Sequence, residues 1–217
     1  MIPKKLHNSW VYPEMDNILE RVNKEIAKDA KVLCPSGGDI FNAFEMPLCD
    51  VKVVVLGLSP YPDGQSANGY AFAINQGQEY PYALRSIVNS FGPNAEKYFD
   101  ETFTLWKNQG FLLLNTALTC RKGEPNSHIK VWHEFTLKTL SHLVKNNSDV
   151  IFYLCGKVAW EMFDKVRTLS KLNLDSVYVL HPSSTYYSGG TWDGYWSLLD
   201  DKYRMKFGKQ IDFILPF

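Results

Sequence analysis

The sequence predicts an α/β protein, a three-layer sandwich with a central sheet of four mainly parallel strands. Two observations carry this prediction. Four short apolar runs rich in branched and aromatic residues recur along the chain, as expected for strands buried on both faces. Segments with the 3.6-residue apolar period of helices lie between them. Strands that alternate with helices favour parallel pairing, because the helix returns the chain to the edge of the sheet where the previous strand began.

The first predicted strand covers residues 51–57, where a β-branched apolar run is closed by a segment rich in Gly, Pro and Asp. Three more apolar runs end at polar or glycine-containing loops and are predicted as strands at 110–114, 149–154 and 176–180. The helical patterns fall at 82–91, 132–145 and 157–166. Ligands of such sheets bind beyond the carboxyl ends of the strands, so we expect the loops after the four strands to share one site.

Length, charge and hydropathy limit the classes of function. The 217 residues contain no repeat or linker, so we expect one domain, 1–217, with its own core. Its 23 basic and 23 acidic residues balance, which excludes a nucleic-acid binder that works by bulk positive charge. We find no membrane-length apolar run and no secretory signal, so we expect a cytoplasmic location and no membrane partner. Four cysteines without metal-binding spacing are expected to be reduced, buried thiols: Cys34, Cys49, Cys120 and Cys155.

Three of the loops at the expected site carry chemically distinctive residues. The loop after the first strand holds Tyr61, Asp63 and Phe72 among turn-forming residues, and it is either a long surface loop or the rigid wall of a pocket. Asn115 follows an apolar run, where its amide either satisfies local backbone groups or reads a nucleobase edge. His181 opens a loop rich in hydroxyls and glycines. Its imidazole is either a structural hydrogen-bonding group or a functional one.

Several motifs along the chain match one family in order and in spacing. They are SPYPDGQSANGYAF at 59–72, LLLNTALT at 112–119, Ser127 and His128 before Trp132, LCGKVA at 154–159, HPS at 181–183 and GKQIDF at 208–213. With these motifs the chain resembles the classical uracil-DNA glycosylases over most of its length. The resemblance implies their α/β fold and a monofunctional hydrolysis that leaves an abasic site, with no cofactor and no metal.

The resemblance also implies a base-flipping site. The flipped pyrimidine would stack on Phe72, and Asn115 would bond to its Watson–Crick edge. Tyr61 would stand against C5 of the ring and exclude the methyl group of thymine. His181 would donate to O2, where negative charge develops as the glycosidic bond breaks.

The resemblance implies that DNA is the partner of this protein. A proteinaceous glycosylase inhibitor is a further candidate partner. We expect the protein to be a monomer. The residues implied to contact DNA include Ser127, His128 and Ser183; of these, Ser127 and Ser183, with neighbouring backbone amides, would hold phosphates. The apolar wedge of the family falls at Thr185, so Tyr186 or Tyr187 is expected to fill the gap left by the flipped base.

The chain departs from the family at the position of the catalytic Asp, which is Ser59. A hydroxyl supplies no negative charge, and we take Asp63 as the substitute that orients the attacking water while Ser59 bonds to that water. The alternative is that Asp63 is a turn residue beside Gly64. Under the first hypothesis, Asp63→Asn abolishes base release.

Other positions carry smaller or different side chains than the family has, namely Pro62, Ala83 and Cys155. They suit a 5-substituted pyrimidine of the kind found in phage DNA, although Tyr61 opposes it. Three functions therefore stay open. They are excision of uracil in repair, excision of a modified pyrimidine in repair or in defence against phage, and a catalytically inactive module that binds DNA or protein.

Overall fold

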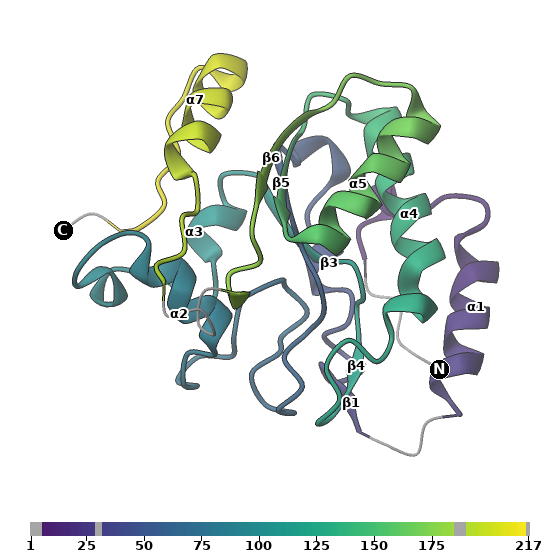
Figure 1. The fold of residues 1–217 in the computed structure, drawn as a ribbon. Helices are drawn as coiled ribbons and strands as arrows, with labels where there is room; N and C mark the ends of the chain where they lie inside the picture. Colours follow the sequence, from purple (N-terminus) through teal and green to yellow (C-terminus); the bar gives the residue numbers. More distant parts are fainter. Residues whose placement is uncertain (1–5, 29–31, 185–189, 216–217) are drawn as a thin grey trace.

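The computed structural model describes residues 6–28, 32–184 and 190–215. Its centre is a sheet of four parallel strands in the order β3-β2-β5-β6 (Figure 1). The strands are β2 (Val53–Gly57), β3 (Phe111–Asn115), β5 (Ile151–Cys155) and β6 (Asp175–Val179). All four predicted strands are confirmed, with ends shifted by at most two residues. Every residue of β2, β3 and β5 is buried, which explains why these strands read as unbroken apolar runs.

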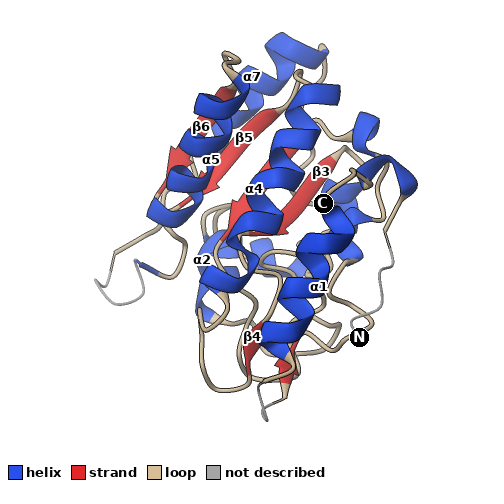
Figure 2. Ribbon diagram, turned by 90° about the vertical axis from the view of Figure 1, so that its right-hand side faces the viewer, coloured by secondary structure: helices blue, strands red, loops and turns tan. Residues whose placement is uncertain are grey.

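Helices cover both faces of the sheet, so the three-layer prediction is confirmed. On one face lie α4 (Ile129–Asn146) and α5 (Lys157–Ser170), with α1 (Met15–Ile26) packed outside α4 (Figure 2). On the other face lie α2 (Tyr82–Asn89), α3 (Thr104–Lys107) and α7 (Trp196–Phe207) (Figure 1). Alternate strand residues belong to separate cores: Val54 packs with the α4 side and Val53 with the α7 side. The three predicted helices correspond to α2, α4 and α5.

Several elements were not predicted. A short antiparallel pair joins β1 (Leu33–Cys34) to β4 (Cys120–Arg121), below the carboxyl ends of the main strands (Figure 1). Two-residue strands carry no period, so the sequence gives no signal for them. Helix α1, in contrast, buries residues at helical spacing and could have been recognised: Met15, Ile18, Leu19, Val22 and Ile26.

The expectation of four buried thiols needs one correction. Cys34, Cys120 and Cys155 are buried, but Cys49 is exposed, because it lies in a short 3₁₀ turn at the surface before β2. Within the described ranges, no helix has the length and apolar character that a membrane crossing requires.

Candidate active site

The loops beyond the carboxyl ends of the sheet enclose a narrow pocket of about 30 Å³. The loop after β2 contributes most of its wall, β3 contributes its last residue, and the start of α2 and the loop after β6 complete it. The lining residues are Ser59, Pro60, Tyr61, Ala67, Tyr70, Phe72, Ala83, Asn115 and His181. The structure thus brings together five of the predicted site residues. Tyr70 and Ala67 are wall residues that sequence reasoning did not single out.

The amide of Asn115 is placed by the register of the sheet. Gly57 ends β2 and stands opposite Asn115 in the parallel ladder. A Cβ at Gly57 would lie 2.5 Å from Oδ1 of Asn115 and 3.3 Å from Cε2 of Phe72, so only glycine leaves room for both side chains. Asn115 is 6% exposed, and no hydrogen bond between described residues engages its amide. A buried amide without a partner at a pocket wall is suited to a polar ligand.

The rest of the loop is held rigidly in the form of a wall. Tyr61 donates its hydroxyl proton to the carbonyl oxygen of Phe72 at 3.0 Å, which ties the two aromatic residues together. Burial, followed by the charge of Asp63, raises the pKa of Tyr61, so the hydroxyl remains a donor. Phe72 has φ of 65°, a left-handed conformation that a bulky residue adopts only when its surroundings enforce it. Of the two interpretations of this loop, the structure supports the rigid wall.

His181 faces Phe72 across the pocket, with ring centroids 5.8 Å apart. Gly156, before α5, has φ of 92° and would bring a Cβ within 3.0 Å of Cβ of His181, so it leaves space for this residue. Nδ1 of His181 accepts from the backbone N–H of Ser183 at 3.3 Å and lies 2.8 Å from its hydroxyl oxygen. Because an N–H can only donate, the proton of the neutral ring is on Nε2. Burial lowers the pKa of His181, which favours this neutral form.

Ser59 contributes a hydroxyl oxygen that is buried and has no hydrogen-bond partner among the described residues. The neighbouring thiol of Cys120 donates to the carbonyl oxygen of Pro60 at 3.4 Å and offers Ser59 at most a weak interaction. Burial raises the pKa of Cys120 to about 12, so the thiol stays protonated. A buried hydroxyl in a pocket wall without a protein partner calls for a polar partner from the pocket.

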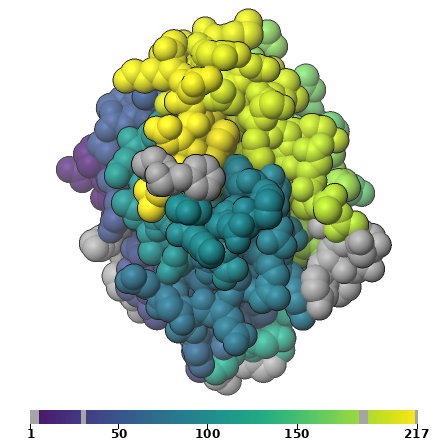
Figure 3. Space-filling view, turned by 90° about the vertical axis from the view of Figure 1, so that its left-hand side faces the viewer, coloured from purple at the N-terminus to yellow at the C-terminus, as the bar shows by residue number. Residues whose placement is uncertain are grey.

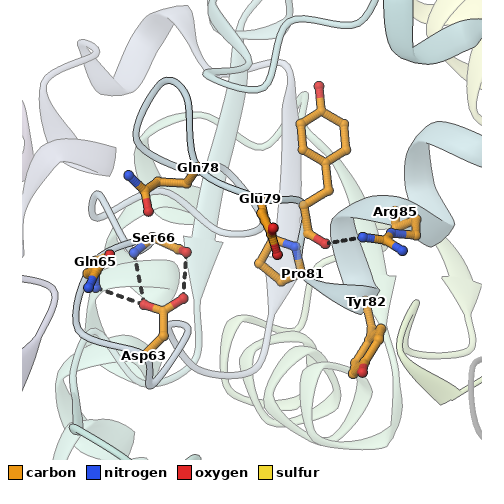
Figure 4. A pocket seen from close by; sticks show the side chains of 9 residues that line it. Asp63, Gln65, Ser66, Gln78, Glu79, Pro81, Tyr82 and Arg85 are labelled. Carbon is orange, nitrogen blue, oxygen red and sulfur yellow. Dashed lines mark hydrogen bonds between the residues drawn. The ribbon is translucent and has the colours of Figure 1, made fainter.

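Asp63 lies outside this pocket, in the turn that follows Tyr61. Its carboxylate accepts from the backbone N–H groups of Gln65 and Ser66, both at 2.8 Å, and from the hydroxyl of Ser66 (Figure 4). Burial opposes ionisation, but these hydrogen bonds and Lys122 together lower the pKa of Asp63. The residue lines a separate hollow of about 670 Å³ with Arg85. This arrangement matches the turn role that the sequence left open as the alternative.

The residues implied to contact DNA differ in how deeply they are buried and in their hydrogen-bond partners. His128 is 1% exposed and lies beneath the surface, where its Nδ1 is 2.9 Å from the hydroxyl oxygen of Thr119. Trp132 donates to the same hydroxyl at 2.7 Å. The imidazole therefore supports the loop from within, and a contact of His128 with DNA stays a prediction.

Two serines remain candidates for DNA contact. Ser127 accepts from the backbone N–H of Arg121 at 2.8 Å and keeps its hydroxyl proton for another acceptor. Ser183 is engaged with His181, so its first role is to orient the imidazole. Thr185, Tyr186 and Tyr187 lie outside the described residues.

A flat aromatic wall, an unengaged amide and a neutral imidazole meet at the carboxyl end of a parallel sheet, an arrangement suited to a flat polar ligand such as a nucleobase. The comparisons with known proteins identify the family. The chain matches the model of the uracil DNA glycosylase superfamily over residues 44–201 and belongs to that superfamily.

Sequence relatives agree with this assignment. The uracil-DNA glycosylase of Flavobacterium johnsoniae is 32% identical over 96% of this chain and 98% of its own length. That of Chlamydia abortus is 35% identical over 74% of this chain and 71% of its own.

Among solved structures, the mimivirus uracil-DNA glycosylase superposes with a TM-score of 0.76 at 20% identity, covering 93% of this chain and 82% of that chain. A mimivirus UNG variant in complex with UGI superposes with a TM-score of 0.77 at 19% identity, covering 96% and 88%. At this level of identity the superposition establishes the shared fold.

Proposed function

We propose that the protein is a DNA glycosylase that flips uracil out of DNA and hydrolyses its N-glycosidic bond, leaving an abasic site. The observation that carries the proposal is the unengaged amide of Asn115, which lines the same pocket as the ring of Phe72 and the neutral imidazole of His181. An amide offers one acceptor and two donors in a plane, which complements the N3–H and O4 groups of uracil. Phe72 supplies a face on which the base stacks.

His181 stabilises the leaving base in this proposal. As the bond between C1′ and N1 breaks, its electron pair passes to the base, and negative charge collects at O2. The Nε2–H of the neutral ring is the available donor, because Nδ1 is engaged with Ser183. None of the described residues that line the pocket is Lys or Arg, and the proposed reaction is simple hydrolysis without a Schiff base.

Ser59 is proposed to hold the attacking water. The water oxygen bonds to C1′ of the sugar and its proton is lost to solvent, while the hydroxyl of Ser59 accepts a hydrogen bond from the water. A hydroxyl does not offset the positive charge that develops on the sugar, so the rate is expected to lie below that of an enzyme with a carboxylate here. Asp63 acts in this proposal from outside the pocket, through the rigidity of its turn.

Tyr61 supports uracil over a 5-substituted pyrimidine. Its ring is fixed by the hydrogen bond to Phe72, and the pocket is narrow, so a group on C5 has little space. Ala83 is the observation that favours the second candidate, because this small residue forms part of the wall. Excision of a modified pyrimidine, with a role in defence against phage, is therefore the competing function.

The partners follow from the same proposal. DNA is the substrate, and Ser127, whose hydroxyl proton is not used in its bond from the Arg121 N–H, is proposed to hold one phosphate. A structural neighbour was solved in complex with UGI, which supports a proteinaceous inhibitor as a further partner.

A substrate panel tests the proposal. The protein is incubated with single- and double-stranded oligonucleotides carrying uracil, thymine or cytosine, and with phage DNA carrying modified cytosine or thymine, and abasic sites are then cleaved with alkali. Breaks at uracil alone support the proposal, whereas breaks only in phage DNA establish the competing function. Binding of DNA without any break would show an inactive binding module.

A further inference from the structure

A second hollow, of about 180 Å³, lies beside the base pocket between α2 and residues 190–192. Helix α2 and the segment after residue 189 adjoin on this face of the molecule, in blue-teal and yellow-green (Figure 3). The polar side chains that line the hollow are Arg85, Ser86, Asn89, Ser90 and Thr191, with Tyr82 and Trp192 among its other walls. The hydroxyl of Ser90 is already engaged with Ile87 and Trp196. Residues 82, 85, 86 and 89 share one face of α2, because they are spaced three or four residues apart.

Of the described residues that line this hollow, only Arg85 is charged. It is exposed, and its guanidinium makes one hydrogen bond among the described residues, to the carbonyl oxygen of Tyr80 at 3.3 Å (Figure 4). No carboxylate of the described chain pairs with it, so most of its five N–H donors remain available. The two neighbouring hollows that Arg85 also lines contain the carboxylates of Asp63, Glu79 and Glu96. An anion therefore finds its best environment on the 190–192 side of Arg85.

Both walls of this hollow also adjoin the base pocket. Ala83, in the first turn of α2, belongs to the pocket wall, and Arg85 to Asn89 follow it along the helix. On the other wall, Trp192 donates to the carbonyl oxygen of Leu180 at 2.8 Å, and Leu180 directly precedes His181 in the chain. At 1.5 Å per residue, the hollow lies within about 10 Å of Ala83 along the helix. That is the distance of one or two nucleotides along an extended strand.

We propose that this hollow binds one phosphate of the DNA strand, one or two nucleotides away from the flipped nucleotide. The guanidinium of Arg85 supplies the charge and a planar pair of donors, and Ser86, Asn89 and Thr191 supply neutral hydrogen bonds. The inference rests on the proposed function for the identity of the strand. It explains how a chain with no net charge positions DNA, through one local cation near the pocket.

Binding to an uncleavable substrate tests this site. The probe is a single-stranded oligonucleotide with one 2′-fluoro-2′-deoxyuridine, whose glycosidic bond resists hydrolysis, and affinity is followed by fluorescence anisotropy from 50 to 200 mM salt. Arg85→Gln is expected to bind about 5-fold more weakly and to lose about 0.7 from the log–log salt slope. Over that fourfold salt range, wild-type affinity should fall about 2.6-fold more than that of the variant.

The matched control is Arg167→Gln, which removes the same charge from the far end of α5, where Arg167 is paired with Asp164. It should bind as the wild type does, and unchanged thermal midpoints confirm that both variants are folded. Methylphosphonate is then placed at each linkage near the analogue in turn. One linkage should weaken wild-type binding as much as Arg85→Gln does and leave the variant unaffected.

Three results would overturn the proposal: wild-type affinity and slope in Arg85→Gln, an equal effect of every linkage on both proteins, or a matching loss in Arg167→Gln. Competition by 10 mM inorganic phosphate without any effect of methylphosphonate would instead reveal a site for free phosphate. Failure of the proposed function has a different signature. The oligonucleotide with thymidine in place of the analogue would then bind equally well, while the linkage scan would still report on Arg85.

Discussion

Substitution of Gly57 by Ala should disable the pocket without touching substrate. A Cβ at this position would lie 2.5 Å from Oδ1 of Asn115, and ordinary contact begins at 3.4 Å, so the amide must move by the difference, 0.9 Å. Misplacement of a positioning group by about 1 Å costs on the order of 100-fold in rate. We therefore expect Gly57→Ala to lower kcat/KM for uracil release about 100-fold. The added methyl group should lower the free energy of unfolding by about 1–3 kcal/mol, because the site is already filled.

The assay is single-turnover release of uracil from an oligonucleotide, at a temperature where thermal unfolding shows the variant to be folded. Gly38→Ala is the matched control, because a Cβ at Gly38 meets nothing within 4 Å. It should keep the wild-type rate. A folded Gly57→Ala protein that releases uracil at the wild-type rate would refute the reasoning, since the amide would then have no role in holding the base.

Three further predictions concern the residues around the pocket. Asp63→Ala should lower the free energy of unfolding by about 1–2 kcal/mol, because the hydrogen bonds within the turn are lost. Asp63→Asn should keep most of the base release. If a stably folded Asp63→Asn protein released no base, the water-orienting role of Asp63 would be supported instead. Because burial lowers the pKa of His181, the folded protein resists the proton that the unfolded chain accepts near pH 6.5. The free energy of unfolding should therefore fall as the pH drops below that value. In ¹⁵N NMR spectra, the ring should stay neutral there, with its proton on Nε2. Ser59→Ala should reduce uracil release at least 10-fold with unchanged affinity for the 2′-fluoro analogue, and an equal loss of affinity would contradict its role on the water.

The fold was predictable where the signal is local. Each buried strand of the sheet is a short apolar run, and the rule for parallel sheets indicated that Asn115 and His181 would meet although 66 residues separate them in the sequence. Helix α7 gave a weaker signal, since its partner is an aromatic cluster gathered from distant segments, in which Trp196 stacks on Phe91 at 4.8 Å. Propensity and period do not report such contacts.

The site was predictable in composition and less so in geometry. The motif names His128 but not its depth, which depends on Thr119 and Trp132 packing around it. Likewise, the turn bonds of Asp63 depend on backbone N–H groups whose directions only the folded loop defines. Gly57 and Gly156 could have been noticed, because glycine at the end of an apolar strand often marks a close approach of another group.

The central claim is that the pocket around Asn115 reads and releases uracil. The most direct measurement is free uracil released under single-turnover conditions by the wild type and by Asn115→Ala, each on the same uracil-containing single strand. The account predicts uracil release by the wild type and a rate at least 100-fold lower in the variant, which loses the hydrogen bonds to the base edge. Equal rates in the two proteins, or no uracil from the wild type, would contradict it.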